Sequence, residues 1–411
     1  MSCAPPWVDA ALVQRALDAE AASADGEAHA QAPAVRSVSA QPLGAAGENF
    51  ASRLLRVRAQ LEGGAQRSLV LKCEAEDAAV RDSIRQSGFF PREIAFLTRV
   101  YPTMQGLLEA AAPGRFPPLA ARCLLHGAEP HAFLLLEDLG ERGFLTADRV
   151  RGLGLRHSLL ALSALARLHA ASAAALAARP PLARELSCPW RTAREDPFDN
   201  VLQLCFGLAG EAALLWPDLP DEYARVLARM KAAVYDKFAA LCRPKPGRFN
   251  VIVHADYWTN NILFRYEHGV PVEVRVVDYQ ISHVSSPAMD LLRFLYTSLH
   301  QDVLERHMDL LVREYHAALQ ETLELLGIES PTLKDVWADI NAHGFYGLFG
   351  AVLSVPFMRA EKGNAPDLDS AFKGEGGISK ETYHTCSRFL TYVLKDFRRR
   401  GWLCWEEFCD P

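Results

Sequence analysis

The chain has 411 residues, of which 50% are hydrophobic and 23% charged, an ordinary composition for a globular protein. This length is enough for two lobes that each bury a core. The formal net charge of -6 gives no large basic surplus of the kind that favours nucleic-acid binding. The 9 cysteines are odd in number and form no C-x-x-C pair, which favours a reduced chain without a structural zinc site.

The sequence lacks the features of a secreted or membrane-spanning chain. No segment has the ~18 uninterrupted apolar residues that a spanning helix requires. Residues 1–10 lack the basic and apolar regions of a signal peptide. We therefore expect a cytoplasmic protein that contacts neither membrane nor nucleic acid and needs no obligatory protein partner.

The N-terminal part predicts one helix followed by strands. Residues 6–22 predict a short amphipathic helix, and residues 35–70 predict strands separated by a turn at 42–50. That turn carries Gly44 and Gly47. Two glycines between strands indicate either an ordinary hairpin turn or a loop whose backbone amides approach an anion, and the pattern alone does not separate the two.

Lys72 stands inside the apolar strand predicted for residues 67–73, an unusual place for a charged side chain. Glu93, in the helix predicted after Pro91, is the carboxylate that we expect to pair with it. A strand Lys held by a helix Glu is part of the kinase machinery. The alternative is that Lys72 snorkels at a strand edge and that Glu93 is a solvated residue favoured by the helix dipole.

The region that follows indicates a boundary between two lobes. Residues 101–122 contain Pro and Gly and are predicted to be irregular. Strands are predicted over residues 123–127 and 131–136, and the composition changes at residues 140–143. From residue 146 onward the chain is predicted to be mostly helical.

Apolar residues at helical spacing predict the later elements. Helices are expected over residues 155–178, 201–216, 220–241, 302–326, 333–358 and 379–400. His169 lies near the end of the first of these, where a lone His is more often structural than catalytic. The helix over residues 333–358 is unusually aromatic, which fits core packing and also the wall of a cleft for a bulky hydrophobic alcohol.

The most informative stretch is H-A-D-Y-W-T-N-N-I-L-F, which begins at His254 and follows a short β-branched strand. A later Val-rich strand ends in Asp278. We expect Asp256, Asn261 and Asp278 to meet at neighbouring strand ends, which is unfavourable unless a cation such as Mg²⁺ joins them. H-x-D, an Asn five residues after the Asp, and an Asp on a later strand form the kinase catalytic pattern.

These motifs resemble the ecdysteroid kinase-like family, also called CHK kinase-like, of the aminoglycoside phosphotransferase and choline kinase branch. The resemblance implies an α+β, bilobal protein kinase-like fold. It implies a small β-rich nucleotide-binding lobe over residues 1–138 and a larger, mainly helical lobe over residues 139–411. The family motifs usually read H-G-D and D-F-Q, so the chain departs at Ala255 and Tyr279. Alanine in place of glycine implies an ordinary backbone conformation at position 255.

The resemblance also implies roles for the residues of the loop. Asp256 would orient the acceptor hydroxyl and take its proton, and Asn261 and Asp278 would hold Mg²⁺ as catalytic residues. His254 and Asp290 would support the loop, although Asp290 also fits a dipole-favoured Asp at a helix N-terminus.

A second set of residues would bind ATP. Lys72 would hold the phosphates, with Glu93 orienting it, and the turn with Gly44 and Gly47 would cover them. The adenine would bond backbone groups near Glu137 and Leu139, between the lobes.

The sequence thus predicts an ATP-dependent small-molecule kinase that transfers the γ-phosphate to an alcohol hydroxyl. The family name and the aromatic helix favour a steroid-like or other hydrophobic alcohol as the acceptor. The alternatives are a choline or aminoglycoside phosphotransferase and a catalytically weak nucleotide-binding pseudokinase. A protein substrate is disfavoured because the A-P-E segment and activation loop of protein kinases are missing after Asp278.

Overall fold

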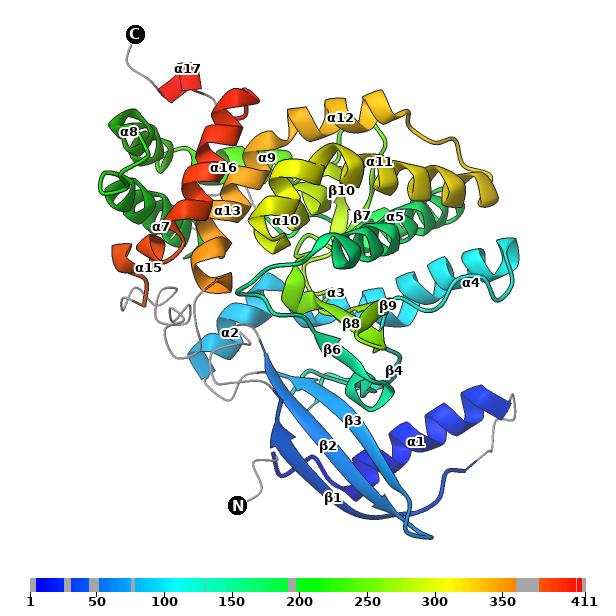
Figure 1. The fold of residues 1–411 in the computed structure, drawn as a ribbon. Helices are drawn as coiled ribbons and strands as arrows, with labels where there is room; N and C mark the ends of the chain where they lie inside the picture. The colour runs from blue at the N-terminus through cyan, green and yellow to red at the C-terminus, as the bar shows by residue number, and fades with distance from the viewer. Residues whose placement is uncertain are drawn as a thin grey trace.

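The computed structural model describes residues 5–25, 31–43, 52–74, 78–129, 131–190, 197–359, 377–403 and 405–408. Figure 1 shows a smaller part built on a sheet and a larger part that is mainly helical. The predicted α+β, bilobal protein kinase-like fold is confirmed.

The smaller lobe is built on a five-stranded antiparallel sheet with strand order β1-β2-β3-β5-β4. Its strands are β1 (Val35–Pro42), β2 (Arg53–Leu61), β3 (Gln66–Cys73), β4 (Cys123–Gly127) and β5 (Phe133–Glu137). Helix α1 (Ala10–Asp25) covers one face, and its Leu12 packs in one buried cluster with Leu55 and Leu71. Because side chains alternate along a strand, Lys72 lies on the other face of β3.

The helical segment after this strand is longer than predicted. Helix α2 (Ala78–Ser87) is followed by α3 (Phe89–Ala95), the π-helical turn η1 (Phe96–Val100) and α4 (Tyr101–Ala111). The prediction of irregular structure from residue 101 was therefore wrong for its first half. Pro102 directly follows the π-helical turn, where the amide of Tyr101 bonds the carbonyl of Phe96 and the hydrogen-bond pattern of the helix changes.

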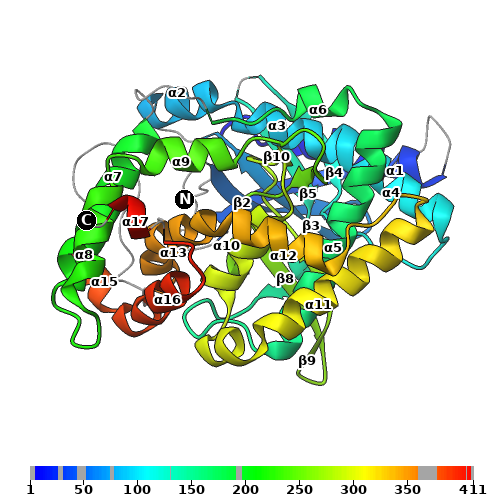
Figure 2. The ribbon, with the colours of Figure 1, turned by 90° about the horizontal axis from the view of Figure 1, so that it is seen from above.

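The larger lobe is centred on two long helices, α5 (Leu155–Ala178) and α11 (Gln301–Leu325), which pack side by side in Figures 1 and 2. Helix α5 is long and apolar enough to cross a membrane by composition. However, 72% of its most apolar stretch is buried inside the fold, as expected for a core helix.

Two small sheets and one buried helix carry the polar motifs. Strand β7 (Val251–Val253) pairs with β10 (His283–Ser285), and β6 (Phe144–Thr146), β8 (Ile262–Glu267) and β9 (Val270–Val276) form a sheet in the order β6-β8-β9. Helix α10 (Ala288–Ser298) follows β10 and is buried along its whole length. The short 3₁₀ turns η2 (Leu139–Arg142) and η3 (Thr259–Asn261) precede β6 and β8.

The remaining helices are α6 (Leu182–Glu185), α7 (Pro197–Ala213), α8 (Asp221–Met230), α9 (Val234–Leu241), α12 (Leu333–Ala342), α13 (Gly344–Met358), α15 (Lys380–His384), α16 (Ser387–Arg399) and α17 (Trp405–Phe408). Most of those that were predicted are shorter than expected, but α7 begins earlier than expected and α6 and α17 were not predicted. The single helices predicted over residues 220–241, 333–358 and 379–400 are each broken into two. At the second break the backbone passes under an indole, since a Cβ on Gly344 would lie 2.2 Å from Cγ of Trp402.

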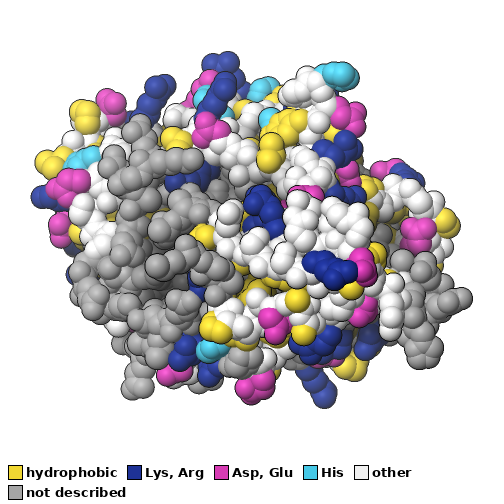
Figure 3. Space-filling view, turned by 90° about the horizontal axis from the view of Figure 1, so that it is seen from below, with side chains coloured by type: hydrophobic (Ala, Val, Ile, Leu, Met, Phe, Trp, Pro, Cys, Tyr) yellow, Lys and Arg dark blue, Asp and Glu magenta, His cyan; other side chains and the backbone are white. Residues whose placement is uncertain are grey.

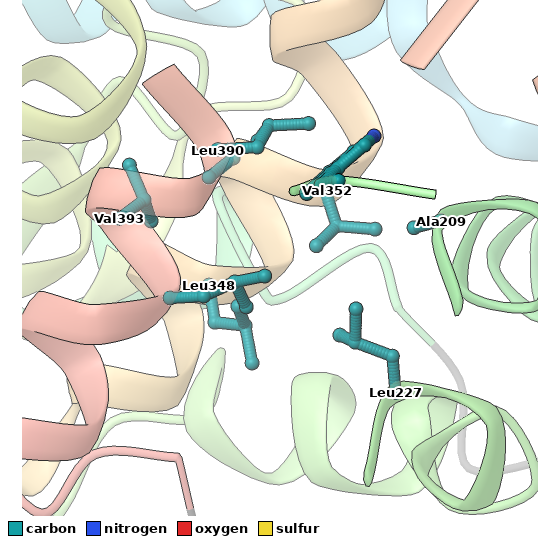
Figure 4. Close-up of a pocket in the computed structure, with 9 residues that line it drawn as sticks. Ala209, Leu227, Leu348, Val352, Leu390 and Val393 are labelled. Atoms are coloured by element: carbon teal, nitrogen blue, oxygen red, sulfur yellow. The ribbon is translucent and has the colours of Figure 1, made fainter. Parts of the chain in front are cut away.

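The described residues show a mixed surface and a small apolar cavity in addition to the polar motifs. On the face in Figure 3, basic and acidic side chains of the described residues are interspersed. Figure 4 shows a cavity of about 10 Å³ lined by Ala209, Leu227, Leu348, Val352, Leu390 and Val393. The cavity is apolar, and its volume is at the lower limit for one water molecule. It is therefore a packing gap between α13 and the helices α7, α8 and α16.

Candidate active site

The backbone of the candidate site has a left-handed conformation at two non-glycine residues, one in the loop after β7 and one after β9. Ala255 has a φ of 68° and Asp278, after β9, has a φ of 69°. The expected ordinary conformation at Ala255 is therefore wrong. A left-handed conformation costs an alanine about 1 kcal/mol, and two hydrogen bonds hold it. The Ala255 amide donates to Asp290 at 2.7 Å, and its carbonyl accepts from the Tyr346 hydroxyl at 3.2 Å.

Asp290, at the start of α10, holds the loop from the inside of the lobe. Its side chain is fully buried and accepts from the backbone amides of His254 and Ala255, both at 2.7 Å. His169 Nε2 lies 3.0 Å from the same carboxylate, while His169 Nδ1 contacts the Tyr315 hydroxyl at 2.7 Å. Burial alone would raise the pKa of Asp290, but His169 and the amides outweigh burial and lower it.

His254 connects the loop to the end of β9. Its Nδ1 accepts from the amide of Asp256 at 3.2 Å, and its Nε2 donates to the carbonyl of Val277 at 2.9 Å. These partners correspond to a neutral imidazole with its proton on Nε2. The ring therefore fixes the loop against the residue that precedes Asp278.

The carboxylate of Asp256 is held by three side chains. Oδ1 accepts from Arg293 at 2.7 Å, and Oδ2 accepts from the Trp258 indole at 3.1 Å and from Asn261 Nδ2 at 3.0 Å. Asn261 Nδ2 also donates to the Asp256 carbonyl at 2.9 Å. The orientation of Asp256 is thus determined from both sides.

Asn261 directly precedes β8, and Asp278 lies two residues after the paired strand β9. The amide of Val277 donates to the carbonyl of Asn261 at 3.0 Å, next to the pairing of Ile262 with Val276. The structure therefore brings the chain segments of Asp256, Asn261 and Asp278 together.

Lys72 joins this site to the smaller lobe. Its Nζ lies 2.6 Å from Glu93 and 2.7 Å from Asp278, and the amide of Tyr279 donates to Glu93 at 3.3 Å. Burial alone would lower the pKa of Lys72, but the carboxylates of Asp278 and Glu93 outweigh it and raise that pKa. Burial raises the pKa of Glu93, against the opposing effect of the Lys72 ammonium. Lys72 therefore stays charged while it is buried.

The donor set suits a hard divalent cation. Mg²⁺ prefers carboxylate and carbonyl oxygens and keeps several waters or phosphate oxygens as ligands. Because Asn261 uses its Nδ2 to bond Asp256, its side-chain oxygen is left without a hydrogen bond within the described chain. The Asp278 side chain is 29% exposed. Asn261 and Asp278 therefore fit the predicted magnesium ligands.

Two residues predicted to lie near the nucleotide are at the lobe boundary. Glu137 is the last residue of β5, and Leu139 begins the turn η2. Glu137 is buried and its carboxylate accepts from the amide of Arg122 at 3.0 Å. Asp138 accepts from Ser68 at 2.6 Å and from the amide of Gly140 at 2.9 Å. Leu139 is buried. The other two residues predicted to bind the nucleotide, Gly44 and Gly47, lie outside the described residues.

An aromatic cluster packs beside the loop. We use this term for Trp190, Phe198, Phe238, Tyr346 and Phe349. Ring centroids lie 4.9 Å apart for Trp190 and Phe198, 4.2 Å for Phe238 and Phe349, and 5.9 Å for Phe238 and Tyr346. Trp190 and Phe198 are half-buried, whereas the other three are buried. The cluster extends from the loop after β7, which Tyr346 contacts, to the surface.

Two arginines of the site were not predicted from the sequence. Arg293, which pairs with Asp256, stands in the otherwise apolar helix α10, three residues after Asp290 and so on the same helix face. A buried charge in an apolar run was the signal that could have identified it. Arg92, next to Glu93, donates to two backbone carbonyls of the larger lobe at 2.7 and 3.3 Å. It holds α3, and hence Glu93, against that lobe.

The match to a family model agrees with this description. The model of the ecdysteroid kinase-like family matches residues 46–328. No curated protein matches the chain. Among solved structures, a GDP complex of a mutant aminoglycoside 2'-phosphotransferase-IIIa is similar at 14% identity and a TM-score of 0.42, covering 89% of this chain and 93% of that one. An aminoglycoside phosphotransferase with GDP and kanamycin is similar at 13% identity and a TM-score of 0.40, covering 89% and 94%.

The fold and the arrangement of the loop define a kinase-like protein of the small-molecule phosphotransferase class. Within that class, the chain belongs to the ecdysteroid kinase-like family, whose model spans most of its length.

Proposed function

We propose that the protein transfers the γ-phosphate of ATP to the hydroxyl of a small, largely apolar alcohol. The observation that carries this proposal is the continuous set of contacts from Glu93 through Lys72 to Asp278, beside the bonded pair Asp256 and Asn261. Phosphoryl transfer needs positioning and charge neutralisation more than covalent help from the protein. These residues supply both.

The nucleotide end of the reaction would depend on Lys72. Its ammonium is already charged and held by Glu93, so it can donate to phosphate oxygens without a change of protonation state. Mg²⁺, held by Asn261 and Asp278, would neutralise phosphate charge when bound. The adenine would meet backbone groups near Glu137 and Leu139.

The acceptor end would depend on Asp256. A carboxylate offers about four sites for hydrogen-bond donors, and Arg293, Trp258 and Asn261 occupy three of them. The remaining site, on Oδ1, would accept the hydroxyl of the alcohol. Asp256 would thereby orient the hydroxyl oxygen toward the phosphate and receive its proton as the new bond forms.

The half-buried rings of the aromatic cluster, Trp190 and Phe198, connect to the loop through Phe238 and Tyr346. Such a wall suits an apolar acceptor and, by cation–π contact, also a quaternary ammonium. One observation favours the apolar class over the cationic one. The charge of Asp256 is already balanced by Arg293, so a choline or aminoglycoside acceptor would find no unpaired carboxylate at that position. An apolar alcohol needs no such partner.

The test is ADP release by the purified protein with Mg-ATP and a panel of sterols, terpenoid alcohols, aliphatic alcohols, choline and an aminoglycoside. We expect at least one apolar alcohol to stimulate ADP release, and we expect Asp256→Ala to abolish the stimulation. Asp302→Ala is the matched control, because this carboxylate is 61% exposed on α11 and should leave turnover unchanged. An untargeted search for phosphorylated metabolites would then identify the acceptor.

Two outcomes would contradict the proposal. Stimulation by choline or the aminoglycoside alone would overturn the apolar class of acceptor. Nucleotide binding without turnover on any compound would indicate a nucleotide-binding protein rather than an enzyme.

A further inference from the structure

Arg293 is a buried cation with a specific pair of partners. Its side chain is 10% exposed, and among the described residues Asp256 is the carboxylate that balances its charge, at 2.7 Å. The second terminal nitrogen of Arg293 donates to the hydroxyl of Ser354 on α13. Burying a guanidinium is unfavourable unless it is paired and hydrogen-bonded, so this arrangement is held tightly.

The position of Arg293 links three parts of the larger lobe. Asp290 and Arg293 project from one face of α10, and together they bind the backbone and the side chain of three consecutive loop residues. Ser354 lies on the helix that carries Tyr346 and Phe349 of the aromatic cluster. A single guanidinium therefore connects the carboxylate of the loop to the wall beside it.

We propose that Arg293 is a positioning residue, which sets the orientation of the Asp256 carboxylate and, through Ser354, holds α13 in register with it. This inference rests on the proposed function, because the orientation of Asp256 matters only if an acceptor hydroxyl binds there. Arg293 would act through Asp256, because each of its terminal nitrogens already donates a hydrogen bond within the protein.

The physical consequence of removing Arg293 is a loss of restraint on one oxygen. Asp256 Oδ2 would keep its bonds from Trp258 and Asn261, but Oδ1 would lose its partner. Oδ1 is the oxygen that has room for the acceptor hydroxyl. A misplacement of about 1 Å at a reacting group lowers the rate by about 100-fold.

The first experiment compares kinetic constants of Arg293→Gln and Arg293→Lys, with the acceptor identified by the panel above. We expect Arg293→Gln to lower kcat by about 100-fold, with the KM for ATP changed by less than about twofold because the nucleotide residues are untouched. Arg293→Lys keeps the charge and one donor, so it should recover part of the loss. Ser354→Ala should raise the KM for the acceptor more than it lowers kcat.

The matched control is Arg400→Gln. Arg400 also donates to a buried carboxylate, that of Asp396, at 2.9 Å, but this pair lies at the C-terminal end of α16, and neither residue has a recorded bond to the loop after β7. The Arg400→Gln variant should lower the free energy of unfolding without changing kcat. If Arg293→Gln behaves in the same way, the positioning role is overturned and Arg293 is merely structural.

The second experiment does not depend on turnover. Thermal unfolding of Asp256→Asn, Arg293→Gln and the double variant should show that the double variant is more stable than the sum of the single losses predicts. Additive losses would overturn the pairing and the proposal with it. A wild-type protein that turns over no compound would refute the proposed function, whereas an active wild type with an equally active Arg293→Gln variant would refute only the positioning role.

Discussion

Tyr279, the residue after the predicted metal ligand, carries a buried polar atom. Its side chain is 1% exposed and its ring stacks on Phe96 with centroids 4.0 Å apart. The hydroxyl has no hydrogen-bond partner among the residues that the structure describes. An unpaired buried hydroxyl costs about 1–3 kcal/mol. The tyrosine therefore adds nothing to the packing that phenylalanine would not supply.

We predict that Tyr279→Phe raises the free energy of unfolding by roughly 1 kcal/mol and leaves the ring stacking intact. Urea unfolding followed by circular dichroism measures the change. The matched control is Tyr257→Phe, which removes a buried hydroxyl that donates to the carbonyl of Ala161 at 2.7 Å and should destabilise the protein. A loss of stability in both variants would show that the Tyr279 hydroxyl has a partner in solution.

Asp290 gives a prediction with a pH dependence. Its pKa is lowered in the folded protein, so the stability it contributes is present above the ordinary carboxyl pKa and is lost as the pH falls through the lowered value. Asp290→Asn should lower the free energy of unfolding by roughly 3 kcal/mol at pH 7. The difference from the wild type should shrink below about pH 4. Urea unfolding at several pH values measures it, and equal stability at pH 7 would contradict the role of Asp290.

At the scale of elements, the break between α12 and α13 comes from a contact that is distant in the sequence. Gly344 faces the Trp402 ring, and a Cβ there would lie 2.2 Å from Cγ and 2.5 Å from Cδ2 of the indole. Helical periodicity continues through this position, which is why the sequence predicted one helix. The structure needs a glycine because the backbone and the indole are in direct contact.

We predict that Gly344→Ala destabilises the protein by about 1–3 kcal/mol, because the methyl group forces the indole or the helix to move. Gly106→Ala is the control, since this glycine lies inside α4 with no atom within 4 Å of its added Cβ. That change should stabilise the protein by about 0.5–1 kcal/mol through helix propensity. Thermal unfolding compares the two variants, and a neutral Gly344→Ala would show that Trp402 can move at little cost.

These elements show which features the sequence could predict. Periodicity identified the strands and most helices, because burial of one face repeats within each element. The sequence did not predict the helix break at Gly344 or the left-handed backbone of Ala255. Each depends on contacts with distant parts of the chain. For Ala255 the deciding partners are Asp290 and Tyr346, which override the local preference of alanine.

At the scale of the whole molecule, the site depends on contacts between the two lobes. Lys72 comes from the sheet of the smaller lobe and Asp278 from the end of β9 in the larger one, and their side chains are 2.7 Å apart. The sequence predicted Lys72 because it stands in an apolar run, and Asp278 because it ends a Val-rich strand after the H-x-D and Asn motif. It could not predict that Lys72 and Asp278 bind each other directly, or that Arg293 would pair with Asp256, because both pairs need the folded arrangement of separate elements.

The final prediction concerns the effect of nucleotide and metal on the whole fold. A ligand that binds only the native state stabilises it by about 2.7 kcal/mol at 100 times its dissociation constant. We expect Mg-ATP to raise the unfolding temperature, because phosphates and Mg²⁺ would engage Lys72, Asn261 and Asp278 from both lobes. Removing Mg²⁺ with EDTA should reduce this rise in unfolding temperature. Without the cation, the oxygens of Asn261 and Asp278 would face the negatively charged phosphates directly.

Asp278→Asn is the variant that separates metal from nucleotide in this measurement. It removes one charge from the metal ligands and one of the two carboxylates that hold Lys72, while Glu93 still pairs with the lysine at 2.6 Å. The variant should therefore retain a shift with ATP that no longer depends on Mg²⁺. A wild-type shift that is equal with and without Mg²⁺ would rule out Asn261 and Asp278 as metal ligands. The interaction of Lys72 with the phosphates would then account for nucleotide binding by itself.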